Sequence, residues 1–386
     1  MINAIGFIPL RAGSKGIPFK NRRKMLGRPL FSWVLLEALL SDLEQVVVFS
    51  DDDWILDYCK KHYSWSAKLQ VVSRPDAGAS DTASTEAAMQ EYLKTLTADW
   101  QSVVLLQATS PTTTREDINA CLRQIEQGND SALTVVRTHR FSWDDAGKPL
   151  NYDPANRPRR QDFDGLLIEN GAVYATTAAA WQSSGVRISG EIGLVEMPAD
   201  SYVEIDEEAD WSTVEQILAR RLKRLRKPSA IDTLILDVDG VFTTGQVSYG
   251  PQGEVSKTFD MRDGMGLEIL REYGIKVIVL TSEDSDIVRS RMEKLKIEDL
   301  NLGVKDKYGW MLKRQEDGLL DPNSCAYVGD DVNDLACLCR VGWSLSPGDG
   351  MSQVLPYVDV VLNNPGGKGA IREACNFIKR YNLRYE

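Results

Sequence analysis

The sequence of 386 residues has no apolar run approaching the roughly 20 residues that a membrane-spanning helix requires. Its first residues, Met1-Ile2-Asn3-Ala4, also lack the basic segment and long apolar stretch of a secretory signal. These two absences predict a protein that does not cross a membrane, and we expect a cytoplasmic location.

A surplus of basic residues is missing as well. The chain has 45 lysines and arginines against 56 aspartates and glutamates, a formal net charge of -11. This balance argues against general affinity for nucleic acid or for anionic membranes. An anionic substrate must therefore be held by local basic clusters or by metal ions.

Cysteine is scarce and scattered. The closest of the six cysteines stand at Cys337 and Cys339, within an apolar helical stretch, so we expect buried thiols rather than a metal or redox site. Short-period repeats and low-complexity segments are absent too, so neither a solenoid nor a disordered tail is indicated.

The chain is longer than one hydrophobic core usually organises, and short β-rich apolar runs alternate with helical patterns along it. A helix from about Trp211 ends in the basic stretch 220–227 before Pro228, so we expect two α/β domains, 1–228 and 229–386. The basic stretch suits a solvated helix end, although it could bind a polyanion.

In the first domain the alternation predicts a parallel sheet flanked by helices. We expect strands at residues 5–9, 45–50, 69–72, 102–107, 132–136, 233–237, 276–281, 325–329 and 358–362, and helices at 30–40, 54–62, 82–94 and 116–126.

Residues 10–21, LRAGSKGIPFKN, form a basic, glycine-containing loop directly after the first predicted strand. Strand, glycine-rich loop and helix in this order direct backbone N–H groups at an anion. Arg11, Lys15 and Lys20 add cations that could neutralise a triphosphate. The loop lacks the Gly-Lys-Ser/Thr ending of a P-loop and the GxGxxG dinucleotide fingerprint. The residues alone leave two interpretations, a phosphate cradle and a basic surface turn.

This loop resembles the signature loop of the CMP-sialic acid synthetases, and further similarity extends over residues 4–218. It includes Arg74-Pro75 before Ser80-Asp81-Thr82, and the strand end LLQATSP, where Ala108 replaces the family's usual proline. The resemblance implies a Rossmann-like nucleotidyltransferase domain that transfers CMP from CTP to the anomeric hydroxyl of a 2-keto sugar acid and releases pyrophosphate. It assigns CTP binding to Arg11, Gly13, Ser14, Lys15, Lys20, Asn21, Arg74, Ser80, Asp81 and Gln107, with Arg11 and Lys20 also catalytic.

Further segments, Arg160-Gln161 and ENGAVY at 169–174, resemble those that line the family's sugar site. The expected ligand is a nonulosonic acid such as N-acetylneuraminate or its deaminated analogue, and the sequence does not identify which. Arg137 and His139 lie nearby at a strand end and have either a substrate contact or a structural role. The resemblance assigns sugar binding to Gln107, Arg160, Gln161, Glu169 and Tyr174.

Charge that develops on the α-phosphate in such a transfer requires cations and Mg²⁺. In the family an Asp-x-Asp pair supplies the metal ligands, and here Glu204-Ile205-Asp206 occupies its place. Glu204 still offers hard oxygen ligands, although its side chain is one methylene longer. We therefore expect Mg²⁺ as a cofactor at Glu204 and Asp206, and we interpret Asp210 mainly as a helix N-terminal acid.

A second acidic motif, LDVDG, places Asp237 and Asp239 on the same side of a predicted strand end. Thr281 ends the strand VIVLT, Lys307 lies in GVKDKYG, and Asp330 lies in YVGDDVNDL. Together these motifs resemble the haloacid-dehalogenase phosphohydrolases, in which the first aspartate attacks phosphorus and the second acts as acid and then base. The resemblance implies a haloacid-dehalogenase-like Rossmannoid domain. Its catalytic residues would be Asp237, Asp239, Thr281 and Lys307, and its Mg²⁺ ligands Asp237, Asp239 and Asp330.

The insertion after this motif, residues 243–259, reads as a hairpin that is too small for a cap domain. With MRDGMG at 261–266 and GGKGAIRE at 366–373, it resembles the capless subgroup that contains the 3-deoxy-manno-octulosonate 8-phosphate phosphatase. Members are typically tetramers, so we expect a homotetramer formed through this domain. Where the subgroup usually has Gly-Arg, this chain has Ser282-Glu283, which could alter leaving-group selection or weaken hydrolysis.

Together the two resemblances predict a bifunctional enzyme. The phosphatase would release a free sugar acid from its 9-phosphate, and the first domain would activate that acid as its CMP derivative. The alternative is a monofunctional cytidylyltransferase whose C-terminal domain serves mainly as an oligomerisation module. A first domain that only binds its ligands is a weaker interpretation, because it leaves the basic loop and the distant carboxylates without a joint purpose.

Overall fold

The computed structural model describes residues 3–13, 16–75, 84–96 and 99–385, and the chain divides into two compact units. The first unit comprises Met1–Arg23 and Pro29–Ile217, and the second comprises Lys24–Arg28 and Leu218–Glu386. The change of unit falls within helix α6 (Glu208–Arg224), whereas the predicted domain boundary at residue 228 stays a prediction. Among the described residues, no helix is long and apolar enough to cross a membrane.

The first unit is an α/β structure. Its sheet has the strand order β5-β4-β1-β6-β8-β7-β9. The elements along the chain are β1 (Ala4–Leu10), α1 (Leu30–Leu40), β4 (Gln45–Ser50), α2 (Asp53–His62), β5 (Leu69–Ser73), α3 (Thr85–Leu93), β6 (Ser102–Leu106), α4 (Arg115–Glu126), β7 (Ser131–Thr138), β8 (Leu166–Thr177), α5 (Ala178–Ser184), β9 (Ile192–Met197) and the start of α6. The two-residue strand β3 (Arg28–Pro29) has one residue in each unit.

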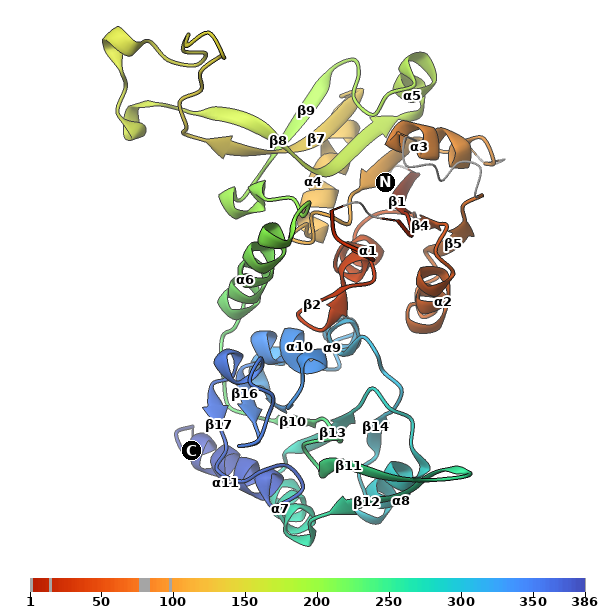
Figure 1. Cartoon of the computed structure of the whole chain (residues 1–386), viewed down its shortest axis with the longest axis vertical. Coiled ribbons are helices and arrows are strands. Elements are labelled where there is room, and N and C mark those ends of the chain that lie inside the picture. Colours follow the sequence, from red (N-terminus) through yellow and green to blue (C-terminus); the bar gives the residue numbers. More distant parts are fainter. Residues whose placement is uncertain (1–2, 14–15, 76–83, 97–98, 386) are drawn as a thin grey trace. The chain divides into compact units, whose positions relative to one another are not determined.

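The sheet of this unit is mixed rather than wholly parallel. Strands β5, β4, β1 and β6 pair in parallel, but β8 runs antiparallel to both β6 and β7. The prediction of a parallel sheet is therefore wrong at β8. The chain returns from β7 through residues 139–165 without a crossover helix, and a connection of this kind allows antiparallel pairing. Figure 1 shows this connection, in yellow, running away from the sheet.

The central strands of the sheet follow from their sequence. β1 is almost wholly buried, and an apolar run of this kind suits a strand that is covered on both faces. Because β1 and β6 are parallel neighbours, the segments that follow Leu10 and Leu106 leave the same edge of the sheet. Ligands of open α/β sheets bind at such an edge.

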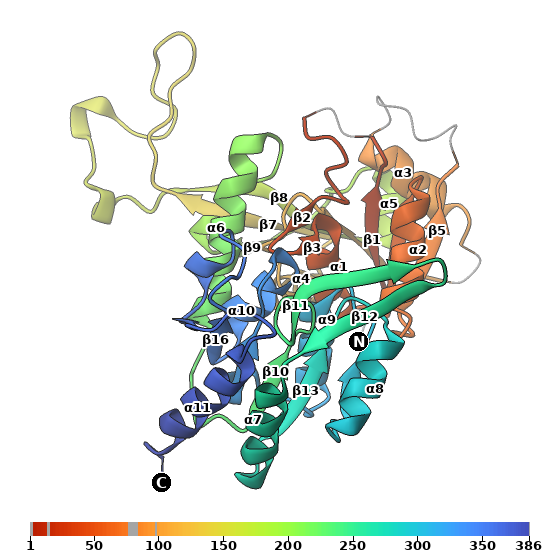
Figure 2. The same ribbon diagram turned by 60° about the horizontal axis from the view of Figure 1, so that its bottom comes forward.

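The second unit contains a parallel sheet in the order β14-β13-β10-β15-β16-β17 and the predicted antiparallel hairpin, β11 with β12. Figure 2 shows the hairpin as a long two-stranded ribbon. The elements are β2 (Lys24–Met25), β10 (Thr233–Leu236), β11 (Thr243–Gly250), β12 (Gly253–Phe259), α7 (Met261–Glu272), β13 (Lys276–Leu280), α8 (Asp286–Lys294), β14 (Asp299–Asn301), α9 (Lys307–Glu316), β15 (Cys325–Val328), α10 (Leu335–Arg340), β16 (Trp343–Ser346), β17 (Val360–Val361) and α11 (Ala370–Asn382).

The carboxyl ends of the three central strands bring the second set of motifs together. Asp237 directly follows β10, Thr281 follows β13, and Asp330 comes two residues after β15. Strand β10 pairs in parallel with both of the others, so all three residues lie at one edge of the sheet. The two-domain α/β fold class is confirmed.

All six cysteines are buried and none forms a disulfide, which confirms the prediction of buried thiols. Burial raises the pKa of the Cys59 thiol to about 12, so this side chain stays protonated at neutral pH. The basic stretch 220–227, at the end of α6, also has local partners: Arg226 donates to the carbonyl of Gly342 at 2.7 Å and pairs with Asp359. These contacts fit a helix end that packs within its own unit.

Candidate active sites

A cavity of about 470 Å³ lies in the first unit, where β1 and β6 end. It is lined by residues of the glycine-containing loop, of the segment after β5, of α3 and of the segment after β6. The side chains of the lining include Arg11, Lys20, Asn21, Arg74, Ser84, Thr85, Glu86, Gln107 and Arg187, and Gly13 contributes backbone.

The loop is held by contacts at both of its ends. The Asn21 side-chain amide donates to the carbonyl of Arg11 at 3.1 Å, and the backbone N–H of Ala12 donates to Asp51 at 2.7 Å. Lys20 donates to the carbonyl of Ile205 at 2.7 Å, and its ammonium lies 3.5 Å from the Asp206 carboxylate. The basic loop and the distant acidic segment therefore meet, as one site requires.

Carboxylates gather beside Lys20. Burial raises the pKa of Glu204, and the negative charges of Asp206 and Glu169 raise it further. Tyr174 donates a hydrogen bond to Glu169. Glu204 and Asp206 are two acidic groups at the mouth of a basic loop, a donor set that suits a hard divalent cation.

Asp210 serves the start of α6. Its carboxylate accepts hydrogen bonds from the backbone N–H groups of Asp206, at 3.0 Å, and Glu207, at 2.8 Å. This geometry agrees with the expected role as a helix N-terminal acid rather than as a metal ligand.

The residues expected at the sugar site do not all share one cavity in the described structure. Arg160 lines a separate cavity of about 900 Å³, together with Arg137, His139 and Glu196. Arg137 makes a salt bridge to Glu196 at 2.8 Å. Gln161 belongs to the same exposed connection between β7 and β8 and lines neither cavity. Ser14, Lys15, Ser80 and Asp81 lie outside the described residues.

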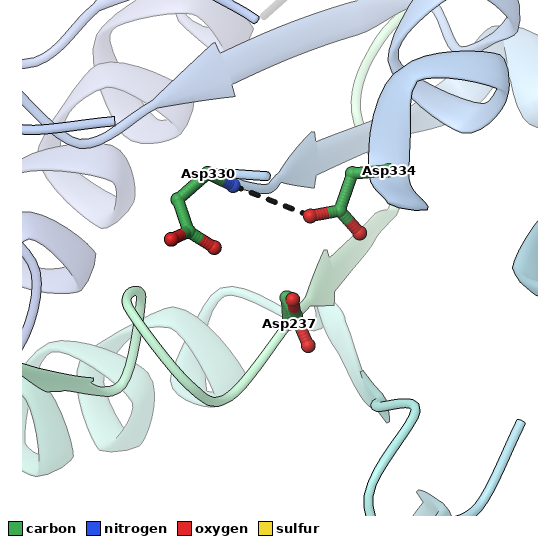
Figure 3. A group of neighbouring side chains, drawn as sticks. All are labelled: Asp237, Asp330 and Asp334. Atoms are coloured by element: carbon green, nitrogen blue, oxygen red, sulfur yellow. Dashed lines mark hydrogen bonds between the residues drawn. The ribbon is translucent and has the colours of Figure 1, made fainter. Parts of the chain in front are cut away.

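In the second unit, oxygen atoms of Asp237, Asp330 and Asp334 lie within 4.8 Å of one another. Figure 3 shows the three carboxyl groups converging, with the backbone N–H of Asp330 donating to Asp334 at 3.2 Å. Lys307 is buried among them, 2.8 Å from Asp237 and 2.7 Å from Asp334. Tyr327 also donates to Asp334 at 2.7 Å, so Asp334 is held by several partners while Asp330 is less constrained.

The electrostatics of this cluster favour an added cation. Burial, together with the negative charges of the Asp334 and Asp237 carboxylates, raises the pKa of Asp330 to about 8. One Asp330 oxygen is buried without a hydrogen-bond partner among the described residues. Burial also raises the pKa of Asp237. For Lys307, burial acts to lower the pKa, but the two neighbouring carboxylates more than offset it, so the pKa is raised. The residues present therefore fit Mg²⁺.

Asp239 lies outside that group of three. Its carboxylate accepts hydrogen bonds from Lys257 of the hairpin at 2.9 and 3.0 Å. Thr281 is buried and accepts a hydrogen bond from the backbone N–H of Glu283 at 3.3 Å. The Glu283 side chain pairs with Lys305 at 2.8 Å, so part of the negative charge that replaces the subgroup's arginine is balanced.

The comparison with known proteins covers nearly the whole chain. The family model described as Cytidylyltransferase matches residues 5–188. N-acylneuraminate cytidylyltransferase B of Danio rerio is 33% identical over 391 residues, which cover 97% of this chain and 91% of that protein. The chain belongs to the N-acylneuraminate cytidylyltransferase family. The N-acylneuraminate cytidylyltransferase of Oncorhynchus mykiss is 34% identical over 382 residues, covering 95% of this chain and 86% of that protein.

This N-acylneuraminate cytidylyltransferase family member also has a phosphatase-like C-terminal region. The 3-deoxy-D-manno-octulosonate 8-phosphate phosphatase of Haemophilus influenzae is 38% identical over 153 residues, 40% of this chain and 85% of that protein. Both resemblances predicted from the sequence motifs are therefore confirmed.

Sequence reasoning missed several residues that the structure brings to the two sites. Glu86 and Arg187 line the cavity of the cytidylyltransferase part and are hydrogen-bonded to each other, although 101 positions separate them. No local motif marks this pair. Lys257 could have been found, because it is a lysine within the apolar alternation of a predicted hairpin.

Proposed function

We propose that the chain transfers CMP from CTP to the anomeric hydroxyl of a nonulosonic acid, such as N-acetylneuraminate or its deaminated analogue. We propose further that the second unit hydrolyses the 9-phosphate of the same kind of sugar acid. The observation that carries the first activity is the contact of Lys20 with the segment of Ile205 and Asp206. It supports one site with cationic and acidic halves.

In the first reaction the sugar oxygen attacks the α-phosphorus and pyrophosphate leaves. Arg11 and Lys20 would bind the phosphate oxygens and neutralise their charge, and Gln107 would orient the ligands in the cavity. Glu204 and Asp206 would hold Mg²⁺, which when bound draws negative charge away from the α-phosphate. Arg160, Gln161, Glu169 and Tyr174 remain proposed contacts of the sugar acid.

In the second reaction the Asp237 carboxylate attacks the phosphorus atom of the monoester. Asp239 protonates the leaving sugar oxygen and then takes a proton from the water that cleaves the aspartyl phosphate. Lys307 and Thr281 would bind the phosphoryl oxygens. Lys257 supports this assignment because its two hydrogen bonds hold the Asp239 carboxyl group in one orientation. Mg²⁺ at Asp237 and Asp330, with the backbone near Asp239, would offset the charge that otherwise repels a phosphate dianion.

A panel of 2-keto sugar acids with CTP and Mg²⁺ tests the first activity through pyrophosphate release. We expect turnover with at least one nine-carbon acid and little with an eight-carbon acid. If no acid in the panel gave pyrophosphate, the alternative would be favoured in which the first domain binds its ligands without catalysing a transfer.

Phosphate release from a nonulosonate 9-phosphate tests the second activity. We expect Asp237→Asn to lower it at least 1,000-fold, because the amide cannot act as the nucleophile. Asp286 is an exposed residue of α8, so Asp286→Asn is the control and should leave the rate unchanged. Hydrolysis that survives Asp237→Asn unchanged would contradict the assignment of the nucleophile.

We also propose a homotetramer formed through the second unit. Tyr249 and Val255 are large apolar side chains on the β11–β12 hairpin that are 72% and 64% exposed, which supports contact with another copy. Sedimentation of the chain measures its oligomeric state, and a monomer at micromolar concentration would contradict this proposal. A tetramer without phosphatase activity would support the alternative in which the domain serves mainly in assembly.

A further inference from the structure

Five residues from near the start of the chain, Lys24–Arg28, belong to the second unit. In the sequence they lie within the cytidylyltransferase match, which spans residues 5–188. Arg28 is the central residue of the contact that they make. Its side chain is only 2% exposed, and its guanidinium lies 4.9 Å from the centre of the Tyr308 ring.

Arg28 binds one carboxylate with two parallel hydrogen bonds. Its Nε and Nη2 donate to the two oxygens of Asp306 at 2.7 and 2.9 Å, across 278 positions of sequence. A planar guanidinium fixes the orientation of a carboxylate in this arrangement, as a single point charge would not. The Asp306 carboxyl group therefore has one defined orientation inside the second unit.

Asp306 is the N-cap of α9, and the first residue of that helix is Lys307. The Asp306 oxygen that binds Arg28 Nε also accepts the backbone N–H of Gly309 at 3.0 Å. The cap sets the direction in which the helix starts, and this direction sets where the Lys307 ammonium lies. Lys307 is fully buried and contacts Asp237 and Asp334 at 2.8 and 2.7 Å.

The same segment contacts the loop that carries the acidic residues. A Cβ on Gly27 would lie 2.1 Å from the carbonyl oxygen of Val332 and 2.8 Å from the Cα of Asn333. Gly27 also has a φ of +82°, which favours glycine. The turn between Asp330 and Asp334 thus packs directly on backbone of residues 24–28.

We propose that Arg28 is a positioning residue of the phosphatase site. Through Asp306 it fixes the start of α9 and so holds the Lys307 ammonium between Asp237 and Asp334. The inference rests on the proposed hydrolysis by the second unit. It implies that residues 218–386 alone lack a part of their active site, which the beginning of the chain supplies.

The test uses the full chain with Arg28→Met and Arg28→Lys, and Lys24→Met as the matched control. Lys24 lies in the same segment but is exposed, so its substitution removes one positive charge without touching Asp306. We expect Arg28→Met to lower kcat for a phosphate monoester at least tenfold while KM changes less than threefold. Arg28→Lys should recover part of the loss, and Lys24→Met should stay within twofold of wild type. Pyrophosphate release from CTP, measured on each variant, reports whether the rest of the chain is intact.

A second readout separates positioning from loss of folding. Beryllium fluoride with Mg²⁺ mimics a phosphoryl group on an aspartate, and calorimetry measures its binding. We expect Arg28→Met to weaken this binding at least tenfold in protein that still melts cooperatively. Asp306→Asn keeps a cap acceptor but loses the charge, and combining it with Arg28→Met should add little further loss if the two act as one pair.

The outcomes are distinct. Unchanged kcat and unchanged beryllium fluoride binding in Arg28→Met, with an active wild type, would overturn the role of Arg28 alone. A loss in Arg28→Met that Lys24→Met reproduces would overturn it as well. A wild type that neither hydrolyses monoesters nor binds beryllium fluoride would overturn the proposed hydrolase function and this inference together.

Discussion

Asp263 is fully buried in α7, and its carboxylate accepts a hydrogen bond from the backbone N–H of Arg372 at 2.8 Å. The other oxygen has no hydrogen-bond partner among the described residues. Burial raises the pKa of this carboxyl group from 3.8 to about 6. Between these two pH values the folded state binds more protons than the unfolded state, so stability falls as pH rises through this range.

Asp263→Asn should remove this pH dependence. The raised pKa corresponds to at most about 3 kcal/mol of unfolding free energy, present below the lower pKa and lost above the higher one. Between pH 4 and pH 7 we expect the unfolding free energy of wild type to fall, relative to that of Asp263→Asn, by up to this amount. Urea unfolding at the two pH values measures it, with exposed Asp286→Asn as the control. Parallel pH profiles of wild type and Asp263→Asn would contradict the prediction.

Lys20 is the residue whose loss should separate the two activities. Hydrogen bonds from a charged donor to phosphate contribute about 1.5–3 kcal/mol each. Lys20→Ala should therefore lower the rate of pyrophosphate release about 10- to 100-fold and leave phosphate release within twofold. Lys60→Ala, an exposed lysine of α2, is the control. Equal effects of Lys20→Ala on both reactions would indicate general damage rather than a role in binding CTP.

At the scale of elements, the middle of β8 shapes the acidic half of the first site. Gly171 has a φ of +69°, and a Cβ there would lie 1.5 Å from a carboxylate oxygen of Glu204. The antiparallel return of β8 thus provides the backbone against which the Glu204 side chain rests. A side chain at this position must displace the carboxylate or the strand.

Gly171→Ala should therefore lower the rate of pyrophosphate release by more than the loss of folding stability alone would cause. We expect pyrophosphate release to fall at least tenfold and the Mg²⁺ concentration for half-maximal rate to rise. Gly185→Ala is a matched control, because Gly185 also has a φ of +69° but its Cβ would meet no atom within 4 Å. It should cost about 1–2 kcal/mol of stability and leave the Mg²⁺ dependence unchanged. The prediction is wrong if both variants shift that dependence equally.

At the scale of the whole molecule, each compact unit contains its own acidic site beside its own lysine. Lys20 stands beside Asp206 in the first unit, and Lys307 stands beside Asp237 in the second. Both sites fit a hard divalent cation, so a chelator should abolish both reactions and added Mg²⁺ should restore them.

Substitution of one metal-binding carboxylate should change the Mg²⁺ requirement of only one of the two reactions. We expect Glu204→Ala to raise the Mg²⁺ requirement of pyrophosphate release alone, and Asp330→Asn to raise that of phosphate release alone. Titration of each variant with Mg²⁺ while both products are followed gives the comparison. A shift of both requirements in either variant would indicate a shared metal site.

The sequence by itself determined the local elements and the chemistry of both motifs. The apolar runs of β1, β4, β6, β10, β13 and β15, the β11–β12 hairpin and the buried thiols were all predictable. So was the family, because contiguous motifs such as residues 11–21 carry their meaning within a few positions. These features depend on neighbours in sequence, and periodicity and composition report such neighbours directly.

The tertiary structure alone decided the partners. The antiparallel course of β8 and the contact of Arg28 with Asp306 have no local signal. The hairpin sequence marks Lys257 as unusual, but it does not identify Asp239 as its partner. Each joins residues whose proximity follows from how strands and helices pack, and a buried charge is compatible with many partners until packing selects one. The sequence therefore identifies the chemistry of the two sites, and the packing of distant segments determines which side chains hold the reacting groups in place.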